Sequence, residues 1–356
     1  MSVARSLLLP VAWLYGGVLA LRHALYDRGI LHSERPAVPT IVVGNLALGG
    51  TGKTPHVELV LRTLDGLAPL TTLSRGYGRT GTSFLEVREE STAREVGDEP
   101  LQLKRKFPAT HVFVGADRVN AIHEMARLQP DLRAVVLDDA FQHRRLNAGL
   151  NILLTTWQRP WCDDALLPVG RLRDLPSRSK AAQIVVVTKC PTLPSAEEQK
   201  RWRQRLGLLP AHHLFFSGIA YNEPSLIVGR SPEGAPNNEQ RTSNCLLFTG
   251  IADPAPLVDH AHRLFANVEH VAFPDHHPFS TGDLERLADR YAKFAPGPKT
   301  LLTTEKDAMR LRSVIDGSPL AALPLAVIGM RAMILNEPEH FTALIRDHVA
   351  THPAHR

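Results

Sequence analysis

The sequence predicts an α/β fold in two units, preceded by one apolar helix at the N-terminus. Short β-branched runs alternate with helical patterns along most of the chain, and several of the runs are continuously apolar. Parallel strands that helices cover on both faces have this pattern, because neither face meets solvent. The second observation is a glycine-rich loop between the first such run and a helix, and the third is an uncharged run at residues 6–21.

A series of apolar runs is expected to form the strands of this fold. The expected strands are Thr40–Val43, Leu70–Leu73, His111–Val114, Ala134–Leu137, Asn151–Leu154, Gln183–Thr188, Leu214–Ser217, Asn244–Phe248, Glu269–Phe273, Thr300–Thr303 and Leu323–Ile328. Their alternation with helical patterns favours layered sheets with right-handed crossovers.

A candidate boundary between the two units lies between residues 195 and 240. The stretch Val228–Ser243 is rich in turn-forming and polar residues, which is typical of a surface loop or a joining segment. We expect residues 1–35 to form the N-terminal apolar segment, residues 36–210 the first domain, and residues 211–356 a second, smaller α/β domain.

The composition of the 356 residues excludes several classes of protein. Hydrophobic residues make up 44% and charged residues 22%, so the chain as a whole is not a disordered protein, a collagen or a coiled coil. At roughly 100–200 residues per domain, this length predicts two domains. The formal charge of +5 is too small for a dedicated nucleic-acid binder and suits an anionic substrate or an anionic membrane surface.

The cysteines indicate a reducing compartment. Cys162, Cys190 and Cys245 lie far apart in the sequence, and no two of them form a Cys-x-x-Cys pair. This spacing argues against both a disulfide scaffold and a structural zinc site.

The uncharged run at residues 6–21 is flanked by Arg5 and Arg22 and contains Pro10. It is shorter than the roughly 20 apolar residues that a membrane-spanning helix needs. Three interpretations remain open: a cleaved signal peptide, a buried core helix, and an interfacial or membrane-embedded anchor. We favour the anchor, because Trp13 suits the headgroup zone and the basic residues that follow suit anionic lipid.

The most specific signal is the segment IVVGNLALGGTGKTPHVELVLRTL at residues 41–64, in which a β-branched run leads through a glycine-rich loop into a helix. The loop residues are Gly49, Gly50, Thr51, Gly52, Lys53 and Thr54. Glycines let backbone N–H groups converge on phosphate oxygens, and the helix N-terminus adds a favourable dipole. In such a loop the lysine reaches the β- and γ-phosphates, and the threonine hydroxyl binds Mg²⁺.

This order of strand, loop and helix predicts a P-loop NTPase-type α/β/α sandwich that binds ATP and Mg²⁺. The alternative is a glycine-rich turn with an incidental Lys-Thr pair. The strict pattern G-x-x-x-x-G-K-[ST] requires glycine where this chain has Ala47, and we expect Gly49 and Gly50 to supply the flexibility. A protein that uses ATP must stay in contact with the cytosol, so a nucleotide site also favours the membrane-anchor interpretation of residues 6–21 over export.

A pair of carboxylates follows the apolar run Ala134–Leu137. A carboxylate at this end of a buried strand holds Mg²⁺ in P-loop proteins, so Asp138 is the first candidate ligand, with Asp139 beside it. Neighbouring side chains on a strand point to opposite faces, so only one of them faces a metal unless the strand has ended. Gln142 and His143 come next, near the same edge. The alternative interpretation of the pair is a helix N-cap or a turn.

Eight segments together closely resemble the tetraacyldisaccharide 4′-kinase (lipid A 4′-kinase) family. They are GNLALGGTGKTP at 44–55, VGDEP at 96–100, GADRVNA at 115–121, LDDAFQHRRL at 137–146, LLPVGRLRD at 166–174, GIADPAP at 250–256, FPDHHPF at 273–279 and TTEKDAMRL at 303–311. Gly-Lys-Thr and Asp-Asp are common among nucleotide hydrolases, whereas the combination with Leu-Pro-x-Gly-x-Leu-Arg and Asp-His-His-Pro is narrowly distributed.

The resemblance implies a membrane-associated P-loop kinase with two α/β/α domains at the cytoplasmic face of a Gram-negative inner membrane. It implies that the γ-phosphate of ATP is transferred, with Mg²⁺, to the 4′-hydroxyl of a tetraacyl glucosamine disaccharide 1-phosphate, a lipid A precursor. A lipid substrate also accounts for an N-terminal anchor. The resemblance leaves the oligomeric state and the acyl-chain preference open.

The resemblance also assigns roles to single residues. It implies that Asp98 is the general base on the sugar hydroxyl and that His276 is its partner. Arg118 and Arg171 lie in motifs that face the site, and the phosphate loop and the acidic pair fall on the family's phosphate and Mg²⁺ positions. Asp174 stands where the family pattern leads us to expect glutamate.

Without the resemblance, both catalytic candidates have simpler interpretations. Asp98 belongs to an Asp-Glu-Pro cluster typical of a helix start or turn, and His276 suits a core histidine or a metal ligand. The scattered histidines nearby have no zinc-like spacing with cysteine. A sugar hydroxyl must still lose its proton during phosphoryl transfer, so a carboxylate within hydrogen-bond reach favours the catalytic interpretation.

Basic residues gather in and after the motif LLPVGRLRD, and they suit either a phosphate clamp or a solvated loop. They are Arg171, Arg173, Arg178 and Lys180. Further on, Thr188-Lys189 resembles the guanine-reading N-K-x-D motif in position, but it lacks asparagine and has Pro191 instead of aspartate. Guanine selectivity is therefore not supported.

Two rival functions remain open from the sequence. One is a P-loop GTPase or ATPase switch, or a metallocentre-assembly protein, against which the failed guanine motif and the apolar N-terminus count. The other is an exported periplasmic protein, which requires cleavage within residues 1–20.

Overall fold

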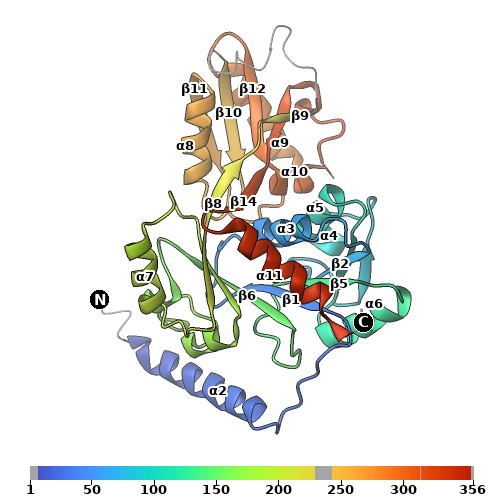
Figure 1. Ribbon diagram of the computed structural model, residues 1–356. Coiled ribbons are helices and arrows are strands. Elements are labelled where there is room, and N and C mark those ends of the chain that lie inside the picture. Colours follow the sequence, from blue (N-terminus) through green and yellow to red (C-terminus); the bar gives the residue numbers. More distant parts are fainter. Residues whose placement is uncertain (1–6, 229–242, 313, 354–356) are drawn as a thin grey trace.

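The structure is a computed structural model that describes residues 7–228, 243–312 and 314–353. It contains two β-sheets, one in each of two units, with helices packed against both faces (Figure 1). The predicted α/β class and the second, smaller α/β unit are thereby confirmed. Apart from its two ends, the expected loop Val228–Ser243 lies outside the described residues.

The larger sheet has nine strands in the order β14-β8-β7-β6-β1-β5-β2-β4-β3. Their bounds are β1 Thr40–Asn45, β2 Leu70–Ser74, β3 Leu85–Val87, β4 His111–Val114, β5 Ala134–Asp138, β6 Leu150–Thr156, β7 Ile184–Thr188, β8 His213–Tyr221 and β14 Met330–Ile334. Neighbours from β8 to β4 are parallel, and only the edge strands β3 and β14 pair antiparallel. The strands β1, β5 and β7 are buried along their whole length, which explains their continuous apolar sequences.

Helices cover both faces of this sheet. They are α3 Lys53–Thr63, α4 Ala93–Val96, α5 Asp98–Lys106, α6 Arg118–Leu128, α7 Ala196–Arg205 and α11 Pro338–Ala350, with the 3₁₀ turns Trp161–Asp163 and Pro176–Ala181. One core joins Leu61 of α3, Leu101 of α5 and Phe341 of α11, and a second joins Met125 of α6 and Trp202 of α7. The order places β1 between β5 and β6, so the loop after β1 opens at the middle of the sheet.

The smaller sheet has five strands in the order β11-β10-β12-β13-β9. Its elements are β9 Ser225–Val228, β10 Asn244–Thr249, α8 Ala255–Leu264, β11 Asn267–Ala272, α9 Thr281–Lys293, β12 Lys299–Thr304, α10 Glu305–Leu311, the 3₁₀ turn Pro319–Ala322 and β13 Leu325–Ile328. Leu287 of α9 packs in a core on one face, and Leu257 of α8 packs in a core on the other.

Two strands that follow residue 210 belong to the larger sheet, although the sequence led us to expect residues 211–356 in the second domain. The strand β8 pairs with β7 of the larger sheet, and β14 pairs with β8, so both belong to the first unit. The helix α11 also returns to the first unit, where Phe341, Ile345 and Val349 are buried in its core. Figure 1 shows β8 and β14 side by side between the two units. We therefore propose residues 225–328 as the second unit, inserted into the first.

The N-terminal helix α2 Leu9–Asp27 lies on the surface of the first unit, at the end of the molecule away from the smaller sheet (Figure 1). Its apolar side chains are largely exposed, Trp13 by 73% and Leu14 by 71%, whereas Ala12 and His23 are buried. The placement contradicts the core-helix interpretation. Among the described residues, no helix is long and apolar enough to cross a membrane.

Candidate active site

A cleft of about 1350 Å³ lies where the carboxyl ends of the central parallel strands face the second unit. It brings together all the sequence-predicted site residues except Arg171. They are Gly49, Gly50, Thr51, Gly52, Lys53, Thr54, Asp98, Arg118, Asp138, Asp139, Gln142, His143 and His276. His276 comes from the second unit and the other residues of this set come from the first. The cleft is therefore formed by both units together.

The phosphate loop is held at both ends by Asn45, the last residue of β1. The side-chain amide of Asn45 donates to the Ala47 carbonyl at 2.7 Å and to the Thr51 hydroxyl at 2.9 Å. Gly52 has φ +87° and precedes α3 directly, while Gly49 has φ +105°. These left-handed conformations favour glycine, because a Cβ would be strained there.

The position of Ala47 explains why the chain tolerates a departure from the strict loop pattern. Ala47 forms an antiparallel bridge to Leu172, and the N–H of Leu48 donates to the Arg171 carbonyl at 2.8 Å. An alanine suits this paired backbone, so the turn is made by the later glycines instead. The expectation that Gly49 bends the loop agrees with its positive φ, whereas Gly50 has no such conformation.

Asp138 ends β5, opposite Val43 of β1, and its side chain is buried. One of its oxygens, Oδ1, is buried without a hydrogen-bond partner among the described residues. Burial raises the pKa of Asp138 above its ordinary value, and the negative charge of Glu99 adds to the rise. A buried carboxylate oxygen without a donor is a site that a cation would stabilise.

Asp139, in contrast, already has cationic partners. The guanidinium of Arg173 holds both of its carboxylate oxygens, one at 2.9 Å, and the Lys53 ammonium lies 3.8 Å away. Although burial favours the neutral form, the hydrogen bonds from Arg173 and the charge of Lys53 hold the pKa of Asp139 below its ordinary value. Asp139 thus positions two cations beside the phosphate loop.

The described residues contain no group of three or more His, Cys, Asp or Glu side chains that could hold a metal ion by themselves. Magnesium in kinase sites is bound by one or two carboxylates together with substrate phosphates and water. The unpartnered oxygen of Asp138 and the hydroxyl of Thr54, both in the cleft, fit that kind of site.

Asp98 begins α5 and forms the expected pair with His276 across the two units. Its Oδ2 lies 3.2 Å from His276 Nδ1 and accepts a hydrogen bond from Arg310 Nε at 3.0 Å, while its Oδ1 accepts from the Glu99 N–H at 2.9 Å. Although burial opposes ionisation, the His276 hydrogen bond and the charges of Lys306 and Arg310 hold the pKa of Asp98 well below its usual range.

The tautomer of His276 follows from its neighbours. The Lys306 ammonium, 3.1 Å from His276 Nε2, can only donate, so Nε2 accepts and Nδ1 carries the proton toward Asp98. His276 also has φ +60°, a conformation that is strained for a non-glycine residue.

Positive φ angles of non-glycine residues concentrate in the cleft. Among the described residues they occur at Asp139, Lys189, His276 and Glu337, and the first three line the cleft. Such conformations cost about 1–3 kcal/mol each and persist where the surroundings fix them, often at functional sites.

Three other predicted residues lie along the cleft wall. The Arg118 guanidinium is buried at the start of α6 and donates to the Ala116 carbonyl at 2.8 Å. The Gln142 side chain donates to the Asn45 carbonyl at 2.7 Å, which ties the segment after β5 to the phosphate loop. Burial, followed by the charge of Arg118, lowers the pKa of His143 and so favours its neutral form.

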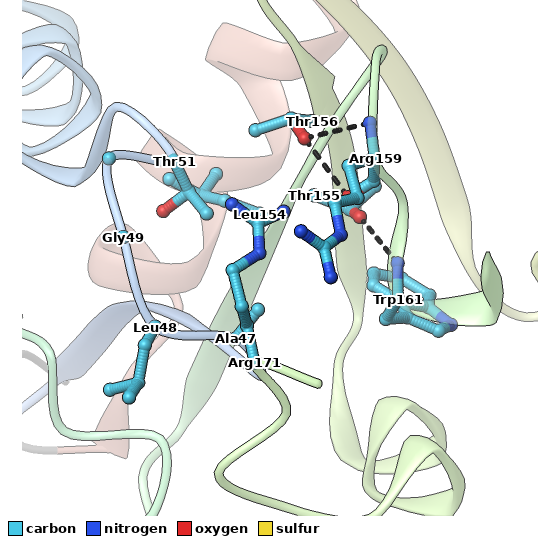
Figure 2. A pocket seen from close by; sticks show the side chains of 11 residues that line it. Ala47, Leu48, Gly49, Thr51, Leu154, Thr155, Thr156, Arg159, Trp161 and Arg171 are labelled. Atoms are coloured by element: carbon cyan, nitrogen blue, oxygen red, sulfur yellow. Dashed lines mark hydrogen bonds between the residues drawn. The ribbon is translucent and has the colours of Figure 1, made fainter. Parts of the chain in front are cut away.

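Arg171 lines a separate small pocket of about 20 Å³ behind the phosphate loop, room for about one water molecule. Figure 2 shows its side chain beside Gly49, and its terminal nitrogen lies 3.6 Å from where a Cβ on Gly49 would stand. The buried carboxylate of Asp164 orients it, accepting from Arg171 Nε at 3.2 Å and from Arg159 at 2.9 Å. Arg171 therefore lies beside the phosphate loop, in a pocket that shares loop residues with the large cleft.

Sequence reasoning missed Lys306 and Arg310 as site residues, although both stand in the quoted TTEKDAMRL motif. Their spacing was the available signal, because residues four apart share one face of a helix such as α10. The chain separation of Asp98 and Arg310 by 212 residues hid their contact. Arg173 appeared in the sequence only as one member of a basic segment.

A family model described as tetraacyldisaccharide-1-P 4′-kinase matches residues 4–350. The chain belongs to the tetraacyldisaccharide 4′-kinase family. It is 39% identical to the tetraacyldisaccharide 4′-kinase of Bacteroides fragilis over 352 residues, which cover 96% of this chain and 93% of that one. It is also 39% identical to the enzyme of the same name from Flavobacterium johnsoniae, with 98% of each chain covered.

Among solved structures, the chain is similar to the "apo" form of LpxK from Aquifex aeolicus in complex with ATP. The TM-score is 0.72 at 26% sequence identity, and the match covers 98% of this chain and 100% of that chain. The family assignment confirms the resemblance drawn from the eight motifs, and it does not favour the GTPase switch or the metallocentre-assembly protein. The roles of the individual site residues remain predictions.

Proposed function

We propose that this chain is a kinase that transfers the γ-phosphate of ATP to the 4′-hydroxyl of tetraacyldisaccharide 1-phosphate in lipid A biosynthesis. One observation carries the proposal. A phosphate loop with its lysine lies in the same cleft as a strained Asp–His pair, and the two come from different units. A kinase needs this arrangement, because nucleotide and acceptor hydroxyl must meet in line.

The chain's own residues supply positioning and charge. Backbone N–H groups of the loop and the start of α3 would hold the β- and γ-phosphates, and Lys53 would neutralise charge that develops on the transferring group. Arg173, fixed by Asp139 and Asn45, presents further positive charge next to the loop. Since the transition state of phosphoryl transfer spreads negative charge over oxygens, fixed cations at this position favour it.

The proton of the acceptor hydroxyl would pass to the Asp98–His276 pair. In the present arrangement Nε2 of His276 accepts from Lys306, and Asp98 orients the ring through Nδ1. A neutral imidazole oriented by a carboxylate is an effective general base near neutral pH. We propose that the pair acts as a unit, with the histidine taking the proton and the aspartate stabilising the charge that results.

The unpartnered carboxylate oxygen of Asp138 and the hydroxyl of Thr54 would hold Mg²⁺, which would supply positive charge next to the phosphates. The high pKa of Asp138 falls when a cation is near, because opposite charge favours the ionised form.

We further propose that the protein works at the cytoplasmic face of the bacterial inner membrane, with α2 on the membrane surface. The exposed side chains of Trp13, Leu14, Val18 and Leu21 lie on a helix that meets the first unit through other residues. A surface helix with exposed aromatic and aliphatic residues suits the interface of a bilayer.

The test is an assay with γ-labelled ATP and an acylated disaccharide 1-phosphate in mixed micelles. Label is expected in the lipid with the wild-type protein, and the Lys53→Ala variant is expected to fold but to lose nearly all transfer. Slow release of free phosphate without lipid labelling would support a nucleotide switch instead and refute the kinase.

A further inference from the structure

Three arginines from separate segments meet at the junction between α2 and the first unit, beside the catalytic cleft. Arg22 comes from α2, Arg144 from the segment after β5, and Arg178 from the 3₁₀ turn Pro176–Ala181. The guanidinium carbons of Arg22 and Arg144 lie 5.4 Å and 5.2 Å from the centroid of one ring, that of Tyr26. Tyr26 thus holds two cations at similar distances.

Arg178, like Arg22, has no carboxylate at ion-pair distance among the described residues, although Asp174 and Asp27 lie within electrostatic range of it. Its guanidinium packs over the Phe141 ring at 5.7 Å, and no hydrogen bond or ion pair of its side chain occurs among the described residues. Burial, followed by the charge of Arg144, lowers the pKa of Arg178, which shows that the two cations lie within electrostatic range. A guanidinium held over a ring and without an ion pair keeps its donors available for an anion from outside.

Two carboxylates lie near the cluster, and both have partners. Asp27 accepts from Arg144 at 2.6 Å, and Asp174 lies 2.6 Å from His23 Nε2. Asp27 is 64% exposed, so solvent screens its charge. Asp174 acts on Arg178 only at longer range, so neither Arg22 nor Arg178 forms an ion pair with a carboxylate among the described residues.

The position of the cluster relates it to both the cleft and the apolar surface. Arg22 donates to the Gln142 carbonyl at 3.3 Å, and Gln142 lines the cleft. On the same helix, Trp13, Leu14 and Val18 are exposed and apolar. A ligand that reaches from the cleft across this junction would meet cations first and an apolar helix next to them.

From this juxtaposition we propose that Arg22, Arg144 and Arg178 form a binding site for a phosphate group carried by a lipid. The favoured source is the anomeric phosphate of the acylated acceptor, distant from the hydroxyl that reacts. This assignment rests on the proposed function, because the acceptor named for the family carries a 1-phosphate. The cations would hold that end of the acceptor while the other end lies at the phosphate loop. Guanidinium groups match phosphate with paired, charge-assisted hydrogen bonds.

The same chemistry is offered by the headgroup of an anionic phospholipid, and the experiment separates the two sources. The variants are Arg178→Gln and Arg22→Gln, with Arg178→Lys to retain the charge. The matched control is Arg201→Gln, an exposed arginine on α7 that pairs only at 3.8 Å with Glu197 one turn away. Arg144 is left intact because it also ties α2 to the first unit through Asp27.

Each variant is assayed with two acceptors, the disaccharide with its 1-phosphate and the same molecule without it. Removing one charge-assisted contact is expected to raise the KM for the phosphorylated acceptor about tenfold, with the KM for ATP unchanged. For the acceptor without the 1-phosphate, the KM should be the same with the wild-type protein and with the variants. The Arg178→Lys variant should recover part of the loss, and Arg201→Gln should behave as wild type.

Sedimentation with vesicles of phosphatidylglycerol, and of phosphatidylcholine as the neutral reference, forms the second arm. A loss of binding to anionic vesicles, with equal effects on both acceptors, assigns the site to a phospholipid headgroup and keeps the phosphate-binding proposal. If the variants match wild type in both arms, the site is overturned while lipid labelling by wild type still supports the kinase. If the wild-type protein labels no lipid at all, the proposed kinase function is refuted. Loss of binding to anionic vesicles in the variants then supports the phosphate-binding site, and unchanged binding refutes it.

Discussion

The buried histidine behind the phosphate loop makes the folding stability of the first unit depend on pH in a defined direction. His56 lies in α3, 1% exposed, with Nδ1 2.7 Å from the Gly52 carbonyl oxygen and Nε2 2.9 Å from the Ser217 hydroxyl of β8. A carbonyl only accepts, so Nδ1 carries the proton and Nε2 accepts from Ser217. The structure therefore requires the neutral ring.

The size of the effect follows from the shift. Burial lowers the pKa of His56 from 6.5 to about 4, against the opposing hydrogen bond to Gly52. Between these two values the unfolded chain binds a proton that the folded chain rejects, so stability is complete above pH 6.5 and falls as pH drops toward 4. At about 1.4 kcal/mol per pKa unit, the loss amounts to about 3 kcal/mol.

The perturbation is His56→Gln, which keeps an amide donor and acceptor of similar size but does not titrate. Urea unfolding of both proteins is followed from pH 7 to pH 4 by tryptophan fluorescence. Trp161 and Trp202 are buried in the first unit, so the signal reports the unit that contains His56. Other titrating groups are present in both proteins and cancel in the difference between their stabilities.

The wild-type protein is expected to lose about 3 kcal/mol more than the variant between pH 7 and pH 4. Any cost of the substitution that does not depend on protonation shifts the variant equally at every pH. Parallel stability curves across this range would refute the buried neutral histidine and, with it, the described link between the phosphate loop and β8.

Three further predictions concern the cleft and the surface. Asp138→Asn is expected to fold, to lose about 100-fold or more in kcat, and to bind ATP with little response to Mg²⁺ in calorimetry, since we propose this carboxylate as a ligand of the metal. Arg310→Gln removes the guanidinium that pairs with Asp98 across the two units, so kcat should fall about tenfold or more with the KM for ATP little changed, while Arg310→Lys should recover part of the loss. Replacing Trp13 and Leu14 together by serine is expected to weaken vesicle binding about tenfold or more without changing the melting temperature, because both side chains are exposed.

Each of these has an outcome that contradicts it. Full Mg²⁺ dependence in Asp138→Asn would remove that carboxylate from the metal site. A kcat equal to that of wild type in Arg310→Gln would show that the Arg310–Asp98 pair does not support the reaction. For the surface pair, Leu128→Ser on α6, an exposed leucine of another helix, is the control, and an equal loss of binding there would argue against a specific role of α2.

The sequence predicted the interior of both sheets and one edge strand, β11, and missed the other three edge strands. Each expected strand coincides with a strand of the structure, whereas β3, β9 and β14 were not predicted. All three are edge strands that pair antiparallel with one neighbour. An edge strand is half exposed, so its sequence need not be a continuous apolar run, and β14 in fact has one buried residue in five. The return of β14 and α11 to the first unit is also the reason why we propose a domain limit other than the one expected from the sequence.

The candidate site was predictable where its residues are local in sequence. The phosphate loop and the acidic pair each follow a strand directly, and β-sheet register brings Val43 and Asp138 together once β1 and β5 are neighbours. The contacts of Arg310 with Asp98 and of Arg173 with Asp139 depend on how distant segments pack. Pattern and spacing carry no information on such packing, and only the resemblance placed Asp98 with His276 in advance.

The aspartate that departs from the family pattern shows how the surface helix is joined to the site. Asp174 is 1% exposed and lies 2.6 Å from His23 of α2, while its neighbour Arg173 grips Asp139 and accepts the Tyr15 hydroxyl on its carbonyl at 2.9 Å. The departure therefore falls on the attachment of α2 and not on the nucleotide side. The adjacent residues Arg173 and Asp174 thus contact α2, and Arg173 also binds Asp139 beside the phosphate loop. Deleting α2 would unpair the buried Asp174 as well as remove the apolar surface, so only point substitutions on the exposed face separate membrane binding from the integrity of the site.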